Sequence, residues 1–320
     1  GDTMNNAKFV TASDAMDSWR DDVLTGKPPT FYAIADSGPL ARIEVGPKLI
    51  TLIGGAPGSG KTGFVMQSAV DALRLNDSLR VVVCNIEMPP EVLLDRQLSR
   101  LSGVPLNFIR YRLLNEHHAE RIDAALSTIE SFAERLCFVR PPFDLANVAA
   151  TATEFTSGHD GGLLLVLDYI QRIAPPRGNG VETPSDRRGS VDVTMNYLRQ
   201  FADVGAAVVV VSSVGRQKDN RGRSSYSGES MNLASFKESG ELEFGADDAF
   251  ILAPSADDAG VRELKHLKAR HTEPVDISLR FDGSIQSFAA IETSNADVHG
   301  LSAALSQMWD RNDAGGDSWD

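Results

Sequence analysis

The stretch KLITLIGGAPGSGKT, residues 48–62, sets the fold of this chain. An apolar run ends at Ile53 and passes into a glycine-rich turn that matches G-x-x-x-x-G-K-[ST]. Glycines in such a loop let successive backbone N–H groups surround a phosphate, the lysine amine reaches the β and γ oxygens, and the threonine hydroxyl binds Mg²⁺. The predicted nucleotide-binding residues are Gly55, Ala56, Pro57, Gly58, Ser59, Gly60, Lys61, Thr62 and Gly63.

The context of this loop separates a true phosphate site from a chance run of glycines. The apolar residues before it are β-branched or leucine, as in a buried strand, and those after it recur at helical spacing from Phe64 to Leu73. A helix that begins at the loop directs the positive end of its dipole at the same phosphates. The stretch therefore predicts a strand, a phosphate loop and a helix in succession.

The rest of the chain alternates strands and helices, which predicts an α/β fold with a mostly parallel sheet. Buried strands are expected at 80–85, 136–140, 163–168, 206–212 and 249–253. Helices are expected over 11–26, with capping by Ser13, over 91–136 and 146–155, and around 191–202. Two last strands, 264–269 and 275–281, with a turn at Asp282-Gly283, predict a C-terminal β-hairpin.

Two acids stand at the ends of predicted strands, where open parallel sheets bind ligands. Asp168 ends LLLVLD, residues 163–168, the Walker B arrangement that holds Mg²⁺. Glu87 follows the strand 80–85 and is placed to orient an attacking water. The alternative for Glu87 is an acid at a helix N-terminus, because Pro89 and Glu91 begin the next helix.

Composition limits the class of protein. A length of 320 residues allows one large α/β core or at most two domains, and no apolar run approaches the length of a membrane span. Cys84 and Cys137 lie in apolar runs and are expected to be reduced thiols. His117-His118 is expected at a solvated helix start, without a zinc site.

The net charge of −13 argues against a nucleic-acid partner, but the two ends hold much of the excess acid. Residues 292–320 contain six acids and one base, and residues 1–30 contain five acids and three bases. The segment RQKDNRGR, 216–223, is instead basic, and it is either a solvated loop or a contact with phosphates. Its candidate contacts are Arg216, Arg221 and Arg223.

Taken together and in order, these motifs resemble the ATPase domain of DnaB-type replicative hexameric helicases of the RecA-like superfamily. The resemblance runs from about residue 30 to 290, and the Glu-Met-Pro, Asp-Tyr-Ile-Gln and Lys-Glu-Ser-Gly segments make it specific. The segments that carry it are GGAPGSGKT (54–62), NIEMPPEVLLDRQLS (85–99), LLVLDYIQRI (164–173), DRRGSVDVTMNYLRQFA (186–202), VVVVSSVGR (208–216), FKESGELEFGADDAFIL (236–252) and KARHTEPVDISLRF (268–281).

The resemblance implies a RecA-like P-loop ATPase core with ATP and Mg²⁺ as cofactors. By it, Lys61 and Thr62 bind nucleotide and metal, Asp168 is the Walker B acid, and Glu87 is the catalytic carboxylate. Lys268 and Arg270 match a Lys-x-Arg pair that reaches in trans to the γ-phosphate of the adjacent subunit, a role that suits cations meeting charge in phosphoryl transfer. The alternative is a surface cation pair. Residues that match contacts to single-stranded DNA are Lys237, Glu238 and Gly240.

Two departures from the family pattern stand out. Ser213 occupies the position where the family has a glutamine, so the expected γ-phosphate sensor is a hydroxyl. Lys237 replaces the usual arginine, which keeps the charge and loses the planar fork. The N-terminal collar of the family is expected to be absent, as in a compact phage- or plasmid-encoded version.

The expected organisation is an N-terminal linker and helix over 1–30, an ATPase domain over 31–291 and an acidic tail over 292–320. The first helix packs either on a neighbouring subunit or on its own domain. The leading hypothesis is a cytoplasmic ring, hexameric by resemblance, that translocates on single-stranded DNA in replication. Its expected partners are copies of itself and a primase, loader or single-strand-binding protein, with no membrane. The alternatives are a RecA/RadA-like recombination filament and a nucleotide-switched regulatory or loader ATPase.

Overall fold

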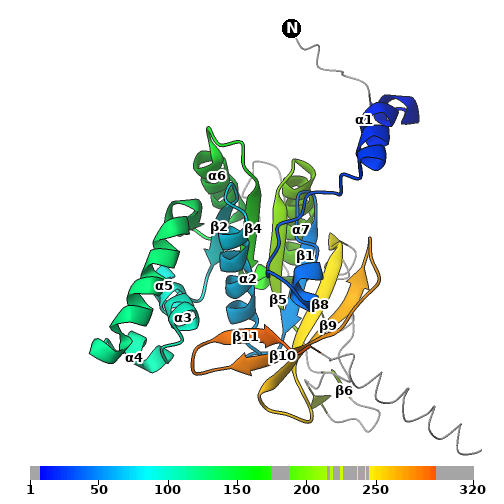
Figure 1. Ribbon diagram of the computed structural model, residues 1–320. Coiled ribbons are helices and arrows are strands. Elements are labelled where there is room, and N and C mark those ends of the chain that lie inside the picture. The colour runs from blue at the N-terminus through cyan, green and yellow to red at the C-terminus, as the bar shows by residue number, and fades with distance from the viewer. Residues whose placement is uncertain are drawn as a thin grey trace, which may run out of the picture.

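The computed structural model describes residues 8–173, 187–214, 217–218, 224–225, 236, 242 and 245–292. Within these residues, nine strands form one sheet in the order β11-β10-β9-β8-β1-β5-β4-β2-β3 (Figure 1). The six strands from β8 to β3 are parallel, and β9, β10 and β11 continue the sheet in antiparallel pairing. The predicted α/β class, the mostly parallel sheet and the C-terminal hairpin are confirmed.

The parallel strands are short, apolar and β-branched, and successive side chains alternate between two cores. In β4, Leu164 and Val166 pack on one side of the sheet, and Leu165 and Leu167 pack on the other. The strands are β1 Ile50–Gly55, β2 Arg80–Asn85, β3 Leu136–Phe138, β4 Leu163–Asp168, β5 Ala207–Ser213, β8 Asp248–Pro254, β9 Val261–Ala269, β10 Ile277–Asp282 and β11 Ser287–Ala290. A separate two-stranded sheet pairs β6 Gln217–Lys218 with β7 Ser224–Ser225.

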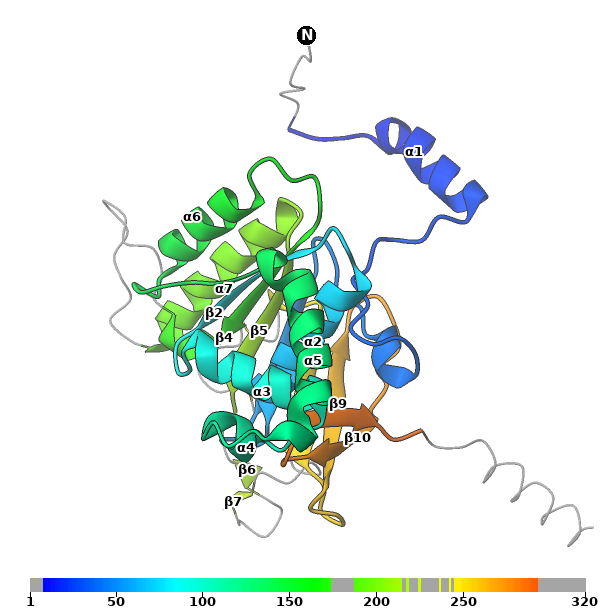
Figure 2. The same ribbon diagram turned by 60° about the vertical axis from the view of Figure 1, so that its left-hand side comes forward.

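Helices cover both faces of the sheet. The core on one face contains side chains of α2 Lys61–Leu75, α3 Pro90–Ser102 and α5 Ala119–Phe132. The core on the other contains side chains of α6 Leu145–Thr156 and α7 Arg187–Asp203. Figure 2 shows these two layers on either side of the strands. Short 3-10 turns complete the chain: η1 Pro39–Arg42, η2 Glu116–His118, η3 Ala133–Arg135 and η4 Ile170–Arg172.

The prediction of one helical segment over 91–136 is wrong in detail. The chain leaves α3 at Gly103, which adopts a left-handed φ of 66°. A short α4, Leu106–Arg110, follows Pro105, and η2 precedes α5. His118 is also not solvated as predicted, because its side chain is buried against the ring of Phe108 at 4.9 Å.

The C-terminal hairpin differs from the sequence interpretation by one strand. The predicted turn at Asp282-Gly283 is present, but it joins β10 to β11 rather than closing the pair formed by 264–269 and 275–281. The apolar content of Ser287–Ala290 is too short to indicate a strand by alternation. Its burial comes from packing on α2.

The first helix, α1 Ala12–Thr25, lies apart from the sheet, and all its residues are exposed (Figure 1). Thr11, not Ser13, caps it: the Thr11 hydroxyl accepts from the Asp14 N–H, and the Asp14 carboxylate accepts from the Thr11 N–H. Gly26 ends it in a left-handed conformation, as expected. Within the described residues, none of the helices combines the length and apolarity needed to cross a bilayer.

Both cysteines carry free thiols. Cys84 is buried in β2 and Cys137 is half-buried in β3. Burial raises the pKa of the Cys84 thiol to about 12 and that of Cys137 to about 11. Both side chains are therefore protonated and contribute to packing.

Candidate active site

The glycine loop lies at the carboxyl end of β1, and its conformation explains its composition. Gly58 and Gly60 have φ of 78° and 93°, which side chains other than glycine adopt only with strain. A Cβ on Gly55 would collide with the Ser59 Oγ. Lys61 Nζ donates to the Ala56 carbonyl at 3.4 Å, across the loop. The lysine side chain therefore folds back across the loop.

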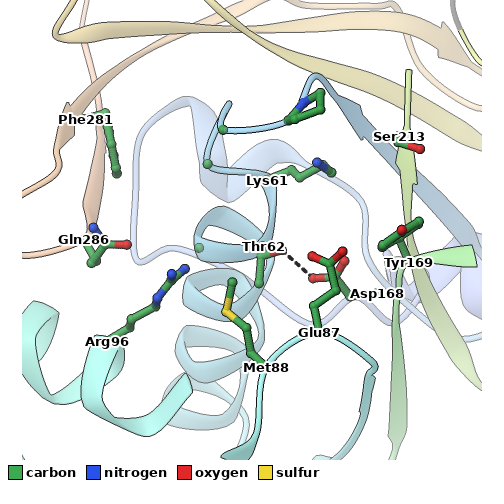
Figure 3. Close-up of a pocket in the computed structure, with 14 residues that line it drawn as sticks. Lys61, Thr62, Glu87, Met88, Arg96, Asp168, Tyr169, Ser213, Phe281 and Gln286 are labelled. Carbon is green, nitrogen blue, oxygen red and sulfur yellow. Dashed lines mark hydrogen bonds between the residues drawn. The ribbon is translucent and has the colours of Figure 1, made fainter. Parts of the chain in front are cut away.

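A carboxylate and a hydroxyl meet beside this loop. The Thr62 hydroxyl donates to Asp168 Oδ2 at 2.6 Å (Figure 3). Asn85 Nδ2 donates to the same oxygen at 3.1 Å. Asp168 is 4% exposed, and burial raises its pKa while the bond from Thr62 and the charge of Lys61 lower it. Burial lowers the pKa of Lys61, against the attraction of Asp168 and Glu87.

Glu87 stands at the entrance to the same site. Asn85 Oδ1 accepts hydrogen bonds from the backbone N–H of Glu87 and of Met88, which fixes the turn that follows β2. The Glu87 carboxylate extends toward Thr62 and Asp168 (Figure 3). Asn85 thus positions both acids, one through its amide and one through the backbone. Its place as the last residue of a parallel strand is the sequence signal that could have identified it.

Lys61, Thr62, Glu87 and Asp168 line one cavity of about 470 Å³. Of the predicted nucleotide residues, Gly55, Ala56 and Ser59 do not line the cavity. The cavity also contains five residues that the sequence analysis did not select. The lining residues are Pro57, Gly58, Gly60, Lys61, Thr62, Gly63, Glu87, Met88, Arg96, Asp168, Tyr169, Ser213, Phe281 and Gln286.

Two of the added residues, Met88 and Tyr169, directly follow the predicted acids, and the other three come from elements without a nucleotide motif. Arg96 lies on α3, and burial together with the charge of Arg110 lowers its pKa. Phe281 and Gln286 come from the β10–β11 hairpin, more than 200 residues after the loop. Figure 3 shows Arg96 and Gln286 on the opposite side of Thr62 from Asp168. Sequence distance leaves no local signal for such contacts.

An aromatic cluster holds the hairpin against the loop. Phe288 stacks on Phe281 at 4.5 Å and meets Phe64 edge-on at 5.6 Å. A Cβ on Gly60 would lie 2.8 Å from the Phe288 ring, so the ring abuts the loop directly. Gln67 Nε2 donates to the Phe288 carbonyl at 2.8 Å, and the Phe288 N–H donates to Gln67 Oε1 at 2.9 Å. The hairpin therefore forms one wall of the cavity.

The predicted sensor Ser213 lines the cavity at the end of β5. A glutamine is nevertheless close, because Gln171 follows β4 and binds the same strand end. Gln171 Nε2 donates to the Ser212 hydroxyl at 2.7 Å, and Gln171 Oε1 accepts from the Ser213 N–H at 3.3 Å. This amide connects the ends of β4 and β5.

The predicted finger residues lie elsewhere. In the sheet, Gly55 pairs with Leu252, whereas Ala269 pairs with Asp248, which is level with Thr51. Residues 268–270 are thus displaced from the loop by about four residues, or roughly 13 Å, along the strands. They lie near the amino-terminal ends of the parallel strands, whereas the loop lies at the carboxyl ends. Arg270 Nη1 donates to Asp247 Oδ1 at 2.7 Å there. Burial lowers the pKa of Lys268, with the charge of Arg270 acting in the same direction.

The predicted DNA contacts fall outside the described residues. They are Lys237, Glu238, Gly240, Arg216, Arg221 and Arg223.

Comparison with known proteins assigns this chain to a family. A family model described as the DnaB-like helicase C-terminal domain matches residues 45–290, well over half of the chain. The chain belongs to the DnaB-like family. The family resemblance of the sequence motifs is therefore confirmed.

Curated relatives of this DnaB-like chain are similar at low identity. A protein named Replicative DNA helicase DnaB from Buchnera aphidicola (Schizaphis graminum) is 25% identical over 252 residues, 76% of this chain and 51% of the relative. One of the same name from Rickettsia bellii is 26% identical over 211 residues, 62% and 39%. A probable plasmid replicative DNA helicase from Chlamydia muridarum is 23% identical over 242 residues, 75% and 50%. The chain spans about half the length of these relatives or less.

Solved structures share the DnaB-like fold. One solved structure, described as an ATPase domain, superposes with a TM-score of 0.73 at 17% identity, covering 89% of this chain and 100% of that one. A DnaB-like replicative helicase described with its interactions with primase has a TM-score of 0.72 at 18% identity, covering 89% and 68%. At these identities the likeness shows the fold alone, a mostly parallel sheet flanked by helices as predicted.

The residues of the DnaB-like site suit a magnesium–nucleoside triphosphate. Hydroxyl and carboxylate oxygens, as on Thr62 and Asp168, are the ligand type that Mg²⁺ prefers. The amides of residues 57–63 and the Lys61 amine suit phosphate oxygens. Glu87 beside them suits activation of a water. The arrangement can therefore perform phosphoryl transfer to water.

Proposed function

We propose that this chain is an ATP-dependent DNA helicase, a translocase that acts as a ring on single-stranded DNA in replication. The single observation that carries the proposal is the position of Arg270 relative to the glycine loop. The two lie toward opposite ends of the strands, roughly 13 Å apart along the strand direction. In this proposal the cation at position 270 therefore contacts the nucleotide of a second copy of the chain. ATP then lies between subunits, and hydrolysis depends on assembly.

In this proposal each side chain of the site has one task. The glycine loop and Lys61 bind the phosphates of ATP, and Thr62 and Asp168 hold Mg²⁺, which neutralises charge on the β and γ oxygens. Glu87 accepts the proton of the attacking water, and Ser213 faces the γ-phosphate. Arg270 and Lys268 of the neighbouring copy stabilise the charge of the transition state.

The proposed assembly also accounts for two exposed apolar surfaces. Met16, Trp19 and Val23 form a stripe on α1, and Trp19 is 59% exposed. A second surface, around α4 and α5, contains Tyr111, Leu113, Leu114 and Leu126, all exposed. Figures 1 and 2 place α1 and α4 at opposite ends of the molecule, so the two surfaces meet only between copies. We propose that α1 docks on this surface of the next subunit.

The docking has a direct test. Trp19→Asp should lower the oligomeric mass measured by light scattering, whereas Asp17→Asn, on the same helix, should leave it unchanged. Equal masses for wild type and Trp19→Asp would show that α1 packs elsewhere.

Single-stranded DNA is the proposed track, and primase, a loader and a single-strand-binding protein are the proposed further partners. The relatives are named as replicative helicases of bacteria and of a plasmid, which supports action on cytoplasmic bacterial, phage or plasmid DNA. The basic segment that contains Arg216, Arg221 and Arg223 is the proposed contact with the DNA phosphates, on the evidence of its charge.

Unwinding of a forked DNA with ATP tests the proposal. Wild type should separate the strands, and Lys61→Ala should not, because the phosphates lose their main cation. Arg270→Ala should bind nucleotide normally and lose DNA-stimulated ATPase by roughly a thousandfold. Normal turnover by Arg270→Ala with weak nucleotide binding would reject a finger that acts in trans.

A further inference from the structure

Asp247 is a buried acid in the turn that precedes β8, at the edge of the sheet opposite to the glycine loop. Its carboxylate receives three hydrogen bonds from three different elements. Oδ1 accepts from Arg270 Nη1 at 2.7 Å, and Oδ2 accepts from Arg199 Nη2 at 3.0 Å and from the Ile50 N–H at 2.8 Å. The end of β9, the helix α7 and the start of β1 therefore converge on one side chain.

The backbone of Asp247 also forms hydrogen bonds with Ile50 and Arg270. Its N–H donates to the Ile50 carbonyl at 2.8 Å, and its carbonyl accepts from the Arg270 N–H at 2.9 Å. Asp247 thus holds Arg270 by main chain and side chain at once. The Asp247 side chain is 3% exposed, so its carboxyl group has little contact with water and is held by these hydrogen bonds instead.

Arg270 combines this anchor with access to solvent. Its side chain is 42% exposed, although one of its nitrogens is bonded to the buried acid. A guanidinium is a planar fork of N–H donors, so a hydrogen bond from Nη1 to a buried acid restrains the orientation of the whole group. Arg270 is therefore held at one nitrogen by a buried acid while its side chain is partly exposed to solvent.

We propose that Asp247 is the positioning residue of Arg270, and that it connects the finger of one subunit to the phosphate loop of the same subunit. The inference rests on the proposed trans site. The connection runs through β1, whose first residue, Ile50, is bonded to Asp247 and whose last residue, Gly55, begins the loop. A shift of β1 when nucleotide binds at one loop is then transmitted to the finger that serves the next site.

The first test separates positioning from binding. Asp247→Asn keeps the shape and an acceptor for the Ile50 N–H but removes the charge that holds Arg270. It should lower the kcat of ATP hydrolysis by about tenfold to a hundredfold, the cost of a catalytic group displaced by about 1 Å. The KM for ATP and the affinity for a fluorescent ATP analogue should stay within about twofold, because the glycine loop is intact.

A double-mutant cycle adds a readout that a structural role would not produce. If Asp247 acts through Arg270, then Asp247→Asn should lower kcat no further in an Arg270→Ala background. Independent, multiplied losses would overturn the proposal. Asp71→Asn, which removes the half-buried ion pair with Arg100 between α2 and α3, serves as the control for lost stability and should not lower kcat tenfold.

Mixed assemblies provide the decisive result. Asp247→Asn and Lys61→Ala chains carry different affinity tags, are co-expressed, and are purified on both tags. Sites that combine the intact loop of the first chain with the intact finger of the second should restore ATPase above the sum of the two separate variants. A parallel experiment co-expresses Arg270→Ala and Lys61→Ala chains in the same way.

The two experiments distinguish the role of Asp247 from the existence of the trans site. Recovery with Arg270→Ala but not with Asp247→Asn would overturn the role of Asp247 and leave the trans site standing. No recovery in either experiment would overturn the trans site itself. Thermal unfolding is recorded for each variant, and Asp247→Ser, which frees space for a water, replaces Asp247→Asn if the latter does not fold.

Discussion

Replacement of Phe288 by alanine tests whether the C-terminal hairpin is part of the nucleotide site. The ring is 3% exposed, abuts Gly60, and contacts Phe64 and Phe281. Loss of a buried phenyl group costs about 3–5 kcal/mol in the free energy of unfolding. Each kcal/mol lowers the Tm of a domain of this size by about 2–4 °C, so a fall of about 6–20 °C is expected.

Phe288→Leu divides this loss into volume and aromatic contact. Leucine keeps most of the apolar volume but removes two aromatic pairs, each worth about 0.5–1.5 kcal/mol. The expected loss for this variant is about 1–3 kcal/mol, the sum of those two pairs. Urea denaturation of both variants measures the two values, and a negligible loss for leucine would show that the ring geometry contributes little.

The functional consequence is measured on the same proteins. Phe281 and Gln286 lie on this hairpin and line the cavity, so the KM for ATP should rise in Phe288→Ala. Phe132→Ala is the matched control, because Phe132 is also buried but lies away from the cavity. It precedes β3, whose first residue pairs with Val81 near the start of β2, whereas the glycine loop lies at the carboxyl ends of the strands. Phe132→Ala should lose similar stability with an unchanged KM. Equal changes in KM for both variants would refute the assignment of the hairpin to the site.

Three single contacts give further predictions. Glu87→Gln should lower the kcat of ATP hydrolysis by about 10²–10⁴ with nucleotide binding retained; retained turnover with a destabilised α3 would leave Glu87 as a helix N-terminal acid. Asp168→Asn should abolish turnover. It should also stabilise the metal-free protein at neutral pH. Burial raises the pKa of Asp168, so ionisation of this carboxyl group as pH rises through that pKa lowers the free energy of unfolding, and asparagine avoids this loss. Urea denaturation should show a larger gain at pH 7 than at pH 4, and the reverse order would contradict this sign. Gly162→Ala places a Cβ in collision with the Tyr32 hydroxyl and should cost about 1–3 kcal/mol, measured by the same denaturation; a neutral effect would mean that Tyr32 moves freely.

Local sequence patterns were enough to predict the sheet, the glycine loop and the two acids at strand ends. Each of these depends on local rules: β-branched runs form buried strands, and positive φ at Gly58 and Gly60 requires glycine. Lys61, Thr62, Glu87 and Asp168 could be selected because parallel strands bring their carboxyl ends to one edge.

The distant residues that complete the site depend instead on tertiary packing. Phe281 and Gln286 reach the cavity because β11 packs on α2 through the Phe64–Phe288 contact, which no spacing in the sequence encodes. Asp247 lies in a segment that carries the family resemblance, but its role depends on the register that brings Ile50 and Arg270 to the same turn. Local patterns predict elements because they act through neighbouring residues, whereas these contacts depend on how nine strands are ordered in the described sheet.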